Sequence, residues 1–321
     1  MSRNTITGIC AIIVSHNRPT LLRETIESVT RQTLPCDILI IDNASGADTV
    51  QIIKEAQAVN PNLTAKFLTQ NIGGAGGFHE GLKEAWRMGY GGFWLMDDDT
   101  IAGADALGAL VAAHEDISTI TGRNPSFVCS NVRWVDGSPC KINVPVLAPS
   151  WLDYAQARRP YLPVRHASFV SLLIARKVVE KHGLPLKEYF IWFDDSEYTY
   201  RISRDGNGAI ALNSIVIHKT SENTAPETSP IIERNAWKYE FGNRNKSSFT
   251  YREYGFRKFI KNLKRITFQT LRSNLSWEWR WKLIYAAAKG IRFSPDAEYV
   301  GDDSAPSRPS KRQIQKHARH V

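Results

Sequence analysis

The stretch FWLMDDD, residues 93–99, decides the fold class of this chain. Four apolar residues are followed at once by Asp97, Asp98 and Asp99. A short apolar run that ends in acids indicates a buried strand that carries carboxylates to the edge of a sheet. Three adjacent negative charges repel one another, and a divalent cation with oxygen ligands would relieve that repulsion and bind a diphosphate. We therefore expect a metal site at the end of this strand, the alternative being a solvated acidic turn.

Strand-like and helix-like segments alternate before this stretch. The apolar runs 9–14, 38–41 and 66–68 predict strands, and helical spacing of apolar residues predicts helices at 19–29 and 50–58 between them. This alternation predicts an α/β fold, in which a mainly parallel sheet has helices on both faces. Such sheets bind ligands just beyond their strands, and polar residues collect there in this sequence.

The segment NIGGAGGF, residues 71–78, follows the third predicted strand. It fits neither the dinucleotide motif GxGxxG nor the phosphate-binding loop GxxxxGK[ST]. Its glycines would let the backbone approach a ligand closely. The alternative is a flexible loop, and a helix is expected after it, to about Met88.

A second acidic group follows an aromatic run later in the chain. After a predicted strand at 169–174, the run 189–193 leads into Asp194, Asp195 and Glu197. Burial and a neighbouring carboxylate would raise the pKa of one of these acids, which suits a general base. The acids can equally stabilise the start of a helix through its dipole, and both can hold at once.

A last predicted strand, 215–217, ends at His218. A single histidine after a strand is usually structural. Because the sheet already carries the acidic triplet, His218 becomes a candidate metal ligand.

The composition is that of a globular protein. With 321 residues the chain can form one large domain with an extension, or two modest domains. It contains no apolar run of about 18 residues and no basic-then-apolar N-terminal pattern, so we expect neither a transmembrane helix nor a signal peptide. The four cysteines lack CxxC spacing and are expected to be reduced thiols of the cytoplasm.

The positive charge is concentrated in the C-terminal part. Residues 234–321 hold 20 Lys+Arg and 7 Asp+Glu, a net charge of +13, whereas residues 1–233 carry −4. Two stripes of residues at helical spacing lie in this part: Phe256, Phe259, Ile260, Leu263, Ile266, Thr267, Thr270 and Leu271, and then Trp277, Trp281, Ile284, Ala288 and Ile291. Basic amphipathic helices with Trp at one edge suit a membrane interface. Alternatively, the stripes pack onto the first domain or across a dimer.

Five motifs in order resemble the inverting glycosyltransferases of family 2, which have the GT-A fold. They are IIVSHNRP (12–19), LIIDNAS (39–45), NIGGAGG (71–77), WLMDDD (94–99) and WFDDSEY (192–198). With His218 the resemblance covers residues 9–218, about two thirds of the chain. The acidic triplet, the WFDDSE motif and the later histidine most resemble bacterial galactofuranosyltransferases, with rhamnosyltransferases next.

The resemblance implies a GT-A fold with a mainly parallel, Rossmann-like sheet flanked by helices, in a catalytic domain at 1–233. The basic stripes at helical spacing predict a C-terminal amphipathic helical extension at 234–300, and the composition predicts a disordered basic tail at 301–321. The tail is rich in Ser, Pro and basic residues.

The resemblance also implies a role for each matching residue. The nucleotide-sugar site would comprise Ser15, Asn17, Arg18, Asp42, Asn43, Asn71, Gly73, Gly74 and Asp98. Mn²⁺ or Mg²⁺ would be bound by Asp97, Asp99 and His218. Asp195 would be the catalytic base with Asp194 beside it, and the acceptor would contact Trp192, Phe193 and Glu197.

The implied activity is metal-dependent transfer of a sugar to a lipid-linked saccharide of a bacterial envelope polymer such as the O-antigen of lipopolysaccharide. UDP-galactofuranose is the favoured donor and dTDP-rhamnose the second choice. A nucleotidyltransferase is an alternative, although SHNRP lacks the glycine-rich loop expected there. The non-enzyme alternative is a membrane-docked module that binds a nucleotide sugar without turnover, and the intact Asp97, Asp99, Asp195 and His218 argue against it.

We expect the protein to lie on the inner face of the cytoplasmic membrane as a peripheral protein. A homo-oligomer is left open. No nucleic-acid partner is expected, because the basic part lacks a motif that reads RNA or DNA.

Overall fold

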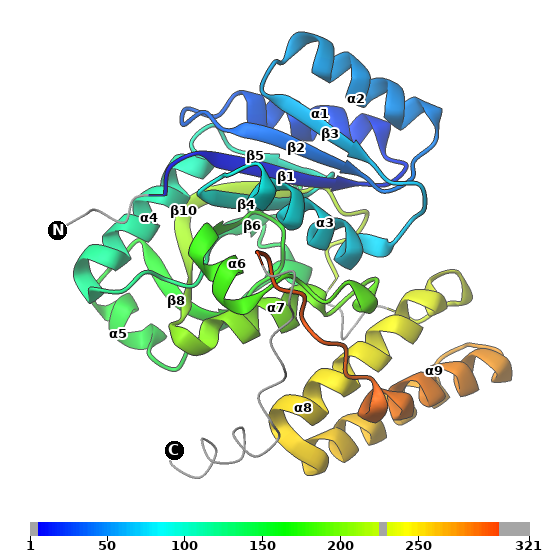
Figure 1. The fold of residues 1–321 in the computed structure, drawn as a ribbon. Helices are drawn as coiled ribbons and strands as arrows, with labels where there is room; N and C mark the ends of the chain where they lie inside the picture. The colour runs from blue at the N-terminus through cyan, green and yellow to red at the C-terminus, as the bar shows by residue number, and fades with distance from the viewer. Residues whose placement is uncertain (1–5, 225–229, 302–321) are drawn as a thin grey trace.

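The computed structural model describes residues 6–224 and 230–301, and its centre is a sheet of ten strands with helices on both faces (Figure 1). The strands are β1 (Ile9–Ser15), β2 (Asp37–Asp42), β3 (Leu63–Phe67), β4 (Gly92–Asp97), β5 (Thr100–Ala102), β6 (Val128–Arg133), β7 (Val146–Leu147), β8 (Tyr161–His166), β9 (Leu172–Ala175) and β10 (Gly208–His218). The α-helices are α1 (Pro19–Thr30), α2 (Ala47–Val59), α3 (Gly73–Arg87), α4 (Ala106–Thr121), α5 (Trp151–Gln156), α6 (Arg176–His182), α7 (Asp194–Ile202), α8 (Glu233–Arg272) and α9 (Trp277–Lys289). Short 3₁₀ turns are η1 (Lys141–Asn143), η2 (Lys187–Tyr189), η3 (Ser203–Asp205) and η4 (Gly290–Arg292).

The strand order confirms the predicted α/β fold. The order is β3-β2-β1-β4-β9-β6-β10-β8-β7, with β5 paired to β10. The first four strands of this order are parallel, and so are β6 and β10. The antiparallel strand β9 joins these two groups, so the sheet is mixed in its second half. Since β1, β2 and β4 are parallel, the residues that follow them meet at one edge of the sheet.

Apolar side chains fill both faces of the sheet. Along β1 they alternate: Ile13 joins the core under α1, α2 and α4, and Ile12 joins the core under α3, α6 and α7. Burial on both faces explains why the strand is apolar throughout.

The glycine segment forms the first turns of α3, so the flexible-loop alternative is wrong from Gly73 onward. A Cβ added at Gly77 would lie 2.4 Å from Cγ1 of Val14, and one added at Gly81 would lie 2.4 Å from Cγ2 of Ile12. These two glycines therefore let the helix pack closely on β1.

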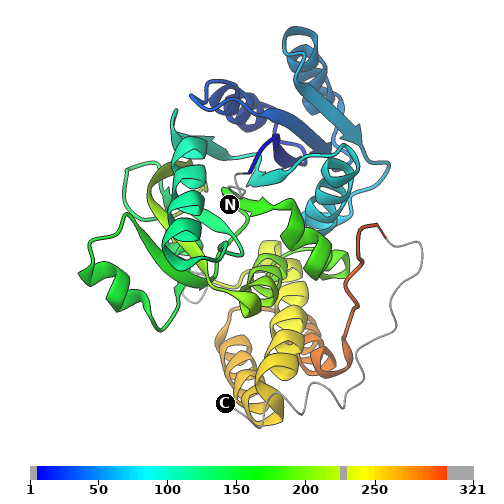
Figure 2. The same cartoon turned by 60° about the vertical axis from the view of Figure 1, so that its left-hand side comes forward.

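The C-terminal helices α8 and α9 form a hairpin at the end of the molecule opposite α1 and α2 (Figures 1 and 2). At Gly255, φ 78° and ψ −179° divide α8 into two helical halves. Phe259 and Ile266 of the predicted stripe are buried, whereas Trp277 and Trp281 are 64% and 68% exposed. The inward-packing alternative is therefore wrong for these two tryptophans within this chain. No helix in the described part of the chain has the length and apolar character needed to span a bilayer.

The segment that follows α9 runs back to α3 and the end of α6 (Figure 1). The carbonyl oxygen of Glu298 accepts a hydrogen bond from the Leu184 amide at 2.8 Å, and its carboxylate contacts His79, Lys83 and Lys187. The tail predicted at 301–321 lies outside the described residues except for Gly301.

Candidate active site

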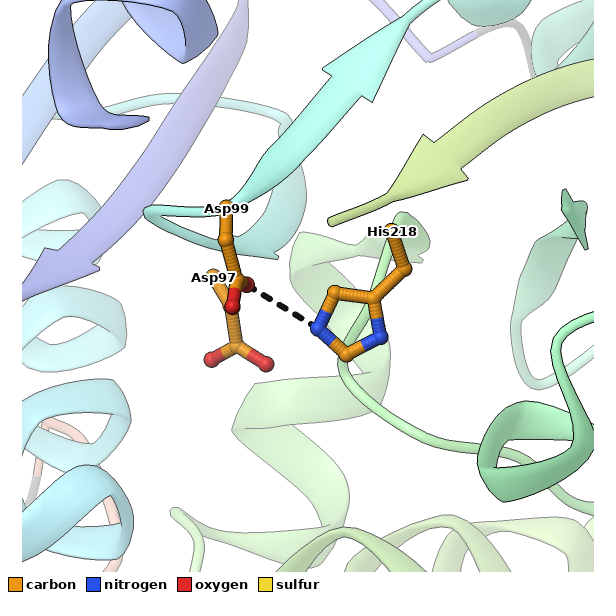
Figure 3. Close-up of side chains that lie close together, drawn as sticks. All are labelled: Asp97, Asp99 and His218. Atoms are coloured by element: carbon orange, nitrogen blue, oxygen red, sulfur yellow. Dashed lines mark hydrogen bonds and ion pairs between the residues drawn. The ribbon is translucent and has the colours of Figure 1, made fainter. Parts of the chain in front are cut away.

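Asp97, Asp99 and His218 lie together at one edge of the sheet (Figure 3). Asp97 ends β4, Asp99 lies in the turn before β5, and His218 ends β10. One ligand atom from each residue lies within 4.8 Å of the others. The strand pairings thus bring the three predicted metal ligands to one place.

The charges in this cluster depend on one another because the groups are buried. Burial raises the pKa of Asp97 to about 7, and the charge of Asp99 adds to the rise. Burial alone would lower the pKa of His218, but the hydrogen bond to Asp99 and its charge raise that pKa to about 10. Burial would likewise raise the pKa of Asp99, and His218 and Arg18 turn the net shift downward. The site therefore favours positive charge next to its two carboxylates.

His218 is held from its other side by residues that no sequence pattern indicated. Its Nδ1 atom lies 2.7 Å from Oδ1 of Asn143 and 4.0 Å from Sγ of Cys140. An Nδ1–H that donates to Asn143 leaves Nε2 to face Asp99 or a metal. Asn143 precedes His218 by 75 residues, and no spacing motif connects the two.

The middle carboxylate, Asp98, is engaged within the fold. Its Oδ2 accepts hydrogen bonds from the Ser15 hydroxyl at 2.8 Å and from the His16 amide at 3.2 Å. Arg18 pairs with both Asp98 and Asp99. Ser15 and Asp98 are buried, whereas the Arg18 side chain is 47% exposed. Among these predicted nucleotide-sugar residues, Arg18 is the one with accessible charge.

Asn43 and Asn71 shape the start of α3. The Asn43 amide donates to the Gly73 carbonyl oxygen at 2.9 Å, and its Oδ1 accepts from the Ile72 amide at 2.9 Å. Oδ1 of Asn71 accepts from the Gly73 amide at 2.8 Å. A Cβ added at Gly74 would have no heavy atom within 4 Å, so this glycine borders open space. The donor contacts proposed for these four residues stay predictions.

Asp42 stands at the end of β2 beside a pocket. Its Oδ2 accepts from the Ser45 amide at 3.3 Å, while Oδ1 is buried without a hydrogen-bond partner among the described residues. Asn17 accepts a hydrogen bond from the Gly46 amide at 2.8 Å and so joins the loops after β1 and β2. The pocket measures about 470 Å³ and is lined by Asp42, Ser45, Lys54, Phe67, Leu68 and Thr69, among others.

Asp194 and Asp195 open α7, as the helix-start interpretation expected. Burial and the charge of Asp195 raise the pKa of Asp194 well above its ordinary value, and the charge of Asp97 adds to the rise. Burial raises the pKa of Asp195 to about 6, against the hydrogen bond that its carboxylate accepts from the Ser196 amide. Asp194 is thus within electrostatic reach of Asp97 in the cluster of predicted metal ligands.

The three residues predicted to hold the acceptor already have protein partners. Glu197 is buried and pairs with Arg201 and Arg252. The Trp192 ring meets Tyr239 edge-on, and the Phe193 ring meets Phe249. Their contact with an acceptor stays a prediction.

Sequence comparison connects this site with known enzymes. The family model described as Glycosyl transferase family 2 matches residues 10–183. Galactofuranosyltransferase GlfT1 of Mycobacterium tuberculosis (strain ATCC 25618 / H37Rv) is 28% identical over 259 residues, covering 78% of this chain and 81% of that protein. Galactofuranosyltransferase GlfT1 of Mycolicibacterium smegmatis is 23% identical, with 77% and 82% covered.

Solved glycosyltransferases of the GT-A fold share the architecture. GalNAc-T7 with UDP, GalNAc and Mn²⁺ has a TM-score of 0.62 at 14% identity, covering 89% of this chain and 56% of that one. S. aureus TarS 1–349 with UDP-GlcNAc has a TM-score of 0.57 at 14% identity, with 89% and 81% covered. These likenesses confirm the predicted GT-A fold. Because the family model spans more than half of the sequence, this chain belongs to glycosyl transferase family 2 and is a glycosyltransferase.

Proposed function

We propose that this protein is a metal-dependent inverting galactofuranosyltransferase that uses UDP-galactofuranose and a lipid-linked saccharide acceptor in the synthesis of a bacterial envelope polysaccharide. The observation that carries the proposal is the convergence of Asp97, Asp99 and His218 within 4.8 Å at the sheet edge. The similarity to proteins named galactofuranosyltransferase supports the choice of sugar.

The three candidate ligand side chains fit a divalent metal. Two carboxylates and an imidazole suit Mn²⁺, and the two carboxylates also suit Mg²⁺. The high pKa of His218 and the raised pKa of Asp97 indicate a site that gains from added positive charge. A bound divalent ion would stabilise the charge that develops on the departing diphosphate.

The nucleotide-sugar donor would lie along the carboxyl ends of β1, β2 and β4. Oδ1 of Asp42, buried without a partner among the described residues, can accept a hydrogen bond from an N–H of a nucleobase. The pocket beside it offers Phe67 as an apolar face. Arg18 forms ion pairs with Asp98 and Asp99, next to the proposed position of the diphosphate. Its guanidinium group can bind phosphate in a bidentate manner.

Asp195 would remove the proton from the acceptor hydroxyl as that oxygen attacks the sugar. Its pKa of about 6 leaves it ionised at neutral pH and still basic enough for this step. Inversion needs one base and no covalent intermediate. The diphosphate is already an activated leaving group, so no protein acid is needed for its departure.

The hairpin would hold the protein on the membrane that carries the acceptor. Trp277, Trp281 and Tyr285 are spaced four residues apart along α9 and are 64%, 68% and 66% exposed. Arg280 and Lys289 lie over the rings of Trp277 and Tyr285. Exposed aromatic rings flanked by cations suit an anionic lipid surface.

A panel of nucleotide sugars tests the proposal. The purified protein is incubated with UDP-galactofuranose, dTDP-rhamnose, UDP-galactopyranose and UDP-GlcNAc, each with Mn²⁺ or with EDTA, and nucleoside diphosphate release and product anomer are measured. We expect metal-dependent release from UDP-galactofuranose above the other donors. Equal release of nucleoside diphosphate in EDTA would reject the metal dependence. Preference for another nucleotide sugar would reject UDP-galactofuranose as the donor.

A further inference from the structure

The turn in front of the acid pair has a strained backbone. Phe190, Trp192 and Phe193 have φ of 64°, 65° and 73°, in the left-handed region that side chains other than glycine rarely adopt. Such a backbone persists only where its surroundings hold it in place. Because Asp194 follows directly, whatever holds this turn also fixes where the acid pair points.

Asn245 of α8 holds this turn. It is 0% exposed, and its side-chain amide lies 2.9, 3.1 and 2.8 Å from the carbonyl oxygens of Tyr189, Ile191 and Trp192. The neighbouring Arg244 donates to Oδ1 of Asn245 at 2.9 Å, which orients the amide with its nitrogen toward the turn. One buried side chain thus binds three carbonyl groups within four consecutive residues.

Aromatic residues of α8 cover the rest of the turn. Ring centroids are 4.8 Å apart for Phe190 and Phe241, 4.9 Å for Trp192 and Tyr239, and 5.5 Å for Phe193 and Phe249. Every residue from 189 to 193 therefore contacts α8, through either Asn245 or a ring.

The same turn also reaches the donor side. The Phe190 carbonyl oxygen accepts from the Ala75 amide at 3.1 Å, and a Cβ added at Gly73 would lie 2.0 Å from that oxygen. Glycine at position 73 is what allows the turn to approach the start of α3 so closely. The turn consequently sets the separation between the acid pair and the glycine segment.

We propose that Asn245 is a positioning residue for the transfer reaction: the C-terminal helix α8, through this one amide, holds the strained turn that aims Asp195 at the acceptor hydroxyl. The inference rests on the proposed function, in which Asp195 is the base. The Asn245 amide nitrogen binds carbonyl oxygens of the turn and, within the described part of the chain, neither carboxylate of the acid pair, so Asn245 acts through the turn. It gives the C-terminal helix α8 a part in positioning the base, in addition to the membrane binding proposed for the hairpin.

The test compares two buried asparagines of the same helix. Asn245→Leu keeps the side-chain volume and removes the amide. Asn262→Leu is the matched control, because its amide donates to Ser247 Oγ at 3.1 Å, away from the turn. We expect Asn245→Leu to lower kcat by about 10–100-fold, because small misplacements of catalytic groups cost this much. The affinity for UDP with Mn²⁺, measured by calorimetry, should change by less than about threefold, since the metal ligands lie on other elements. Asn262→Leu should lose thermal stability without this loss of kcat.

A double variant separates positioning from general damage. If Asn245 acts through Asp195, adding Asn245→Leu to Asp195→Asn should cost almost nothing further in kcat. The acid limb of the kcat–pH profile should also move in Asn245→Leu and stay in Asn262→Leu. If Asn245→Leu does not fold, Asn245→Ser, which keeps one donor, should show the same pattern with a smaller loss.

The outcomes distinguish two failures. If Asp195→Asn loses most of its turnover but Asn245→Leu behaves like Asn262→Leu, the positioning role is overturned and the proposed function stands. The same conclusion follows if the loss of kcat caused by Asn245→Leu multiplies with that caused by Asp195→Asn. If Asp195→Asn keeps its turnover, the assignment of the base falls, and the role of Asn245 falls with it.

Discussion

The Nε2 atom of His218 lies 2.9 Å from Oδ1 of Asp99, although the two residues are 119 positions apart in the sequence. The antiparallel pairing of β10 with β5 accounts for this, because it sets His218 opposite Thr100, the residue after Asp99. Asp99 also pairs with Arg18 from the loop after β1. One carboxylate therefore connects three segments of the chain at the proposed metal site.

Replacing this carboxylate should abolish turnover and leave the fold intact. Asp99→Asn keeps the shape and one hydrogen-bonding oxygen but lacks the charge that a divalent ion requires. Because a metal supplies several kcal/mol of stabilisation to a departing diphosphate, we expect a loss of at least about 100-fold in kcat. Circular dichroism checks the fold, and Asp116→Asn on the exposed face of α4 is the matched control. Full activity of Asp99→Asn in EDTA would contradict the metal role.

The hydrogen bond between Nδ1 of His218 and Oδ1 of Asn143 should increase the affinity for the metal. Asn143→Leu removes the acceptor for Nδ1, and such partners of ligating histidines typically contribute about 10–100-fold to metal affinity. Titration of Mn²⁺ in the presence of UDP should show a loss in this range. Asn143→Asp keeps the acceptor and should stay close to the wild type. Equal affinities for all three proteins would show that Asn143 does not orient the imidazole.

The base should produce an acid limb in the pH–rate profile. Burial raises the pKa of Asp195 to about 6, so kcat should fall about tenfold per unit as pH drops below about 6, where the carboxylate becomes protonated. The raised pKa also affects the free energy of unfolding, because the folded state binds this proton more tightly than the unfolded state. The resulting stabilisation is fully present below about pH 4 and is lost as pH rises through about 6. Asp195→Asn should lower kcat on the order of 10²–10⁴-fold and remove the limb. If Asp194→Asn did so and Asp195→Asn did not, the roles within the pair would be reversed.

Replacing two glycines of α3 with alanine should change the free energy of unfolding in opposite directions. Gly81→Ala would place a Cβ 2.4 Å from Ile12, so we expect a loss of about 1–3 kcal/mol in the free energy of unfolding. Gly74→Ala meets no heavy atom within 4 Å and should gain about 0.4–1 kcal/mol, because alanine loses less entropy on folding. Urea unfolding of both variants measures the difference. If Gly74 borders the donor, its variant should combine higher stability with a higher KM for the nucleotide sugar.

The exposed tryptophans should govern membrane binding. The double variant Trp277→Ser/Trp281→Ser should bind anionic vesicles more weakly, and wild-type binding should fall with salt because surface charges are screened beyond about 10 Å at 0.1 M. Trp151→Ser on α5, whose tryptophan is 39% exposed, is the control and should bind like the wild type. Co-sedimentation at low and high salt measures both effects. Absence of wild-type binding at either salt would indicate that the tryptophans pack across a dimer.

Local patterns were enough to predict the fold class and where the charged groups would gather. The apolar run ending at Asp97 predicted a strand that delivers carboxylates, because alternation and burial follow from the side chains of neighbouring residues. The order of five motifs predicted the glycosyltransferase family, which the comparisons confirm. The basic C-terminal helices were also visible in composition and spacing, although the exposed side of α9 was not.

Tertiary structure alone decided which partners these groups have. It turned Asp98 toward Ser15, placed Asn143 behind His218 and brought Asn245 to the turn before Asp194. It also set Gly77 and Gly81 against β1. Periodicity reports how each element is buried, but a contact between residues far apart depends on which elements pack together and in which register. Those partners could be seen only once the sheet order and the position of α8 were known.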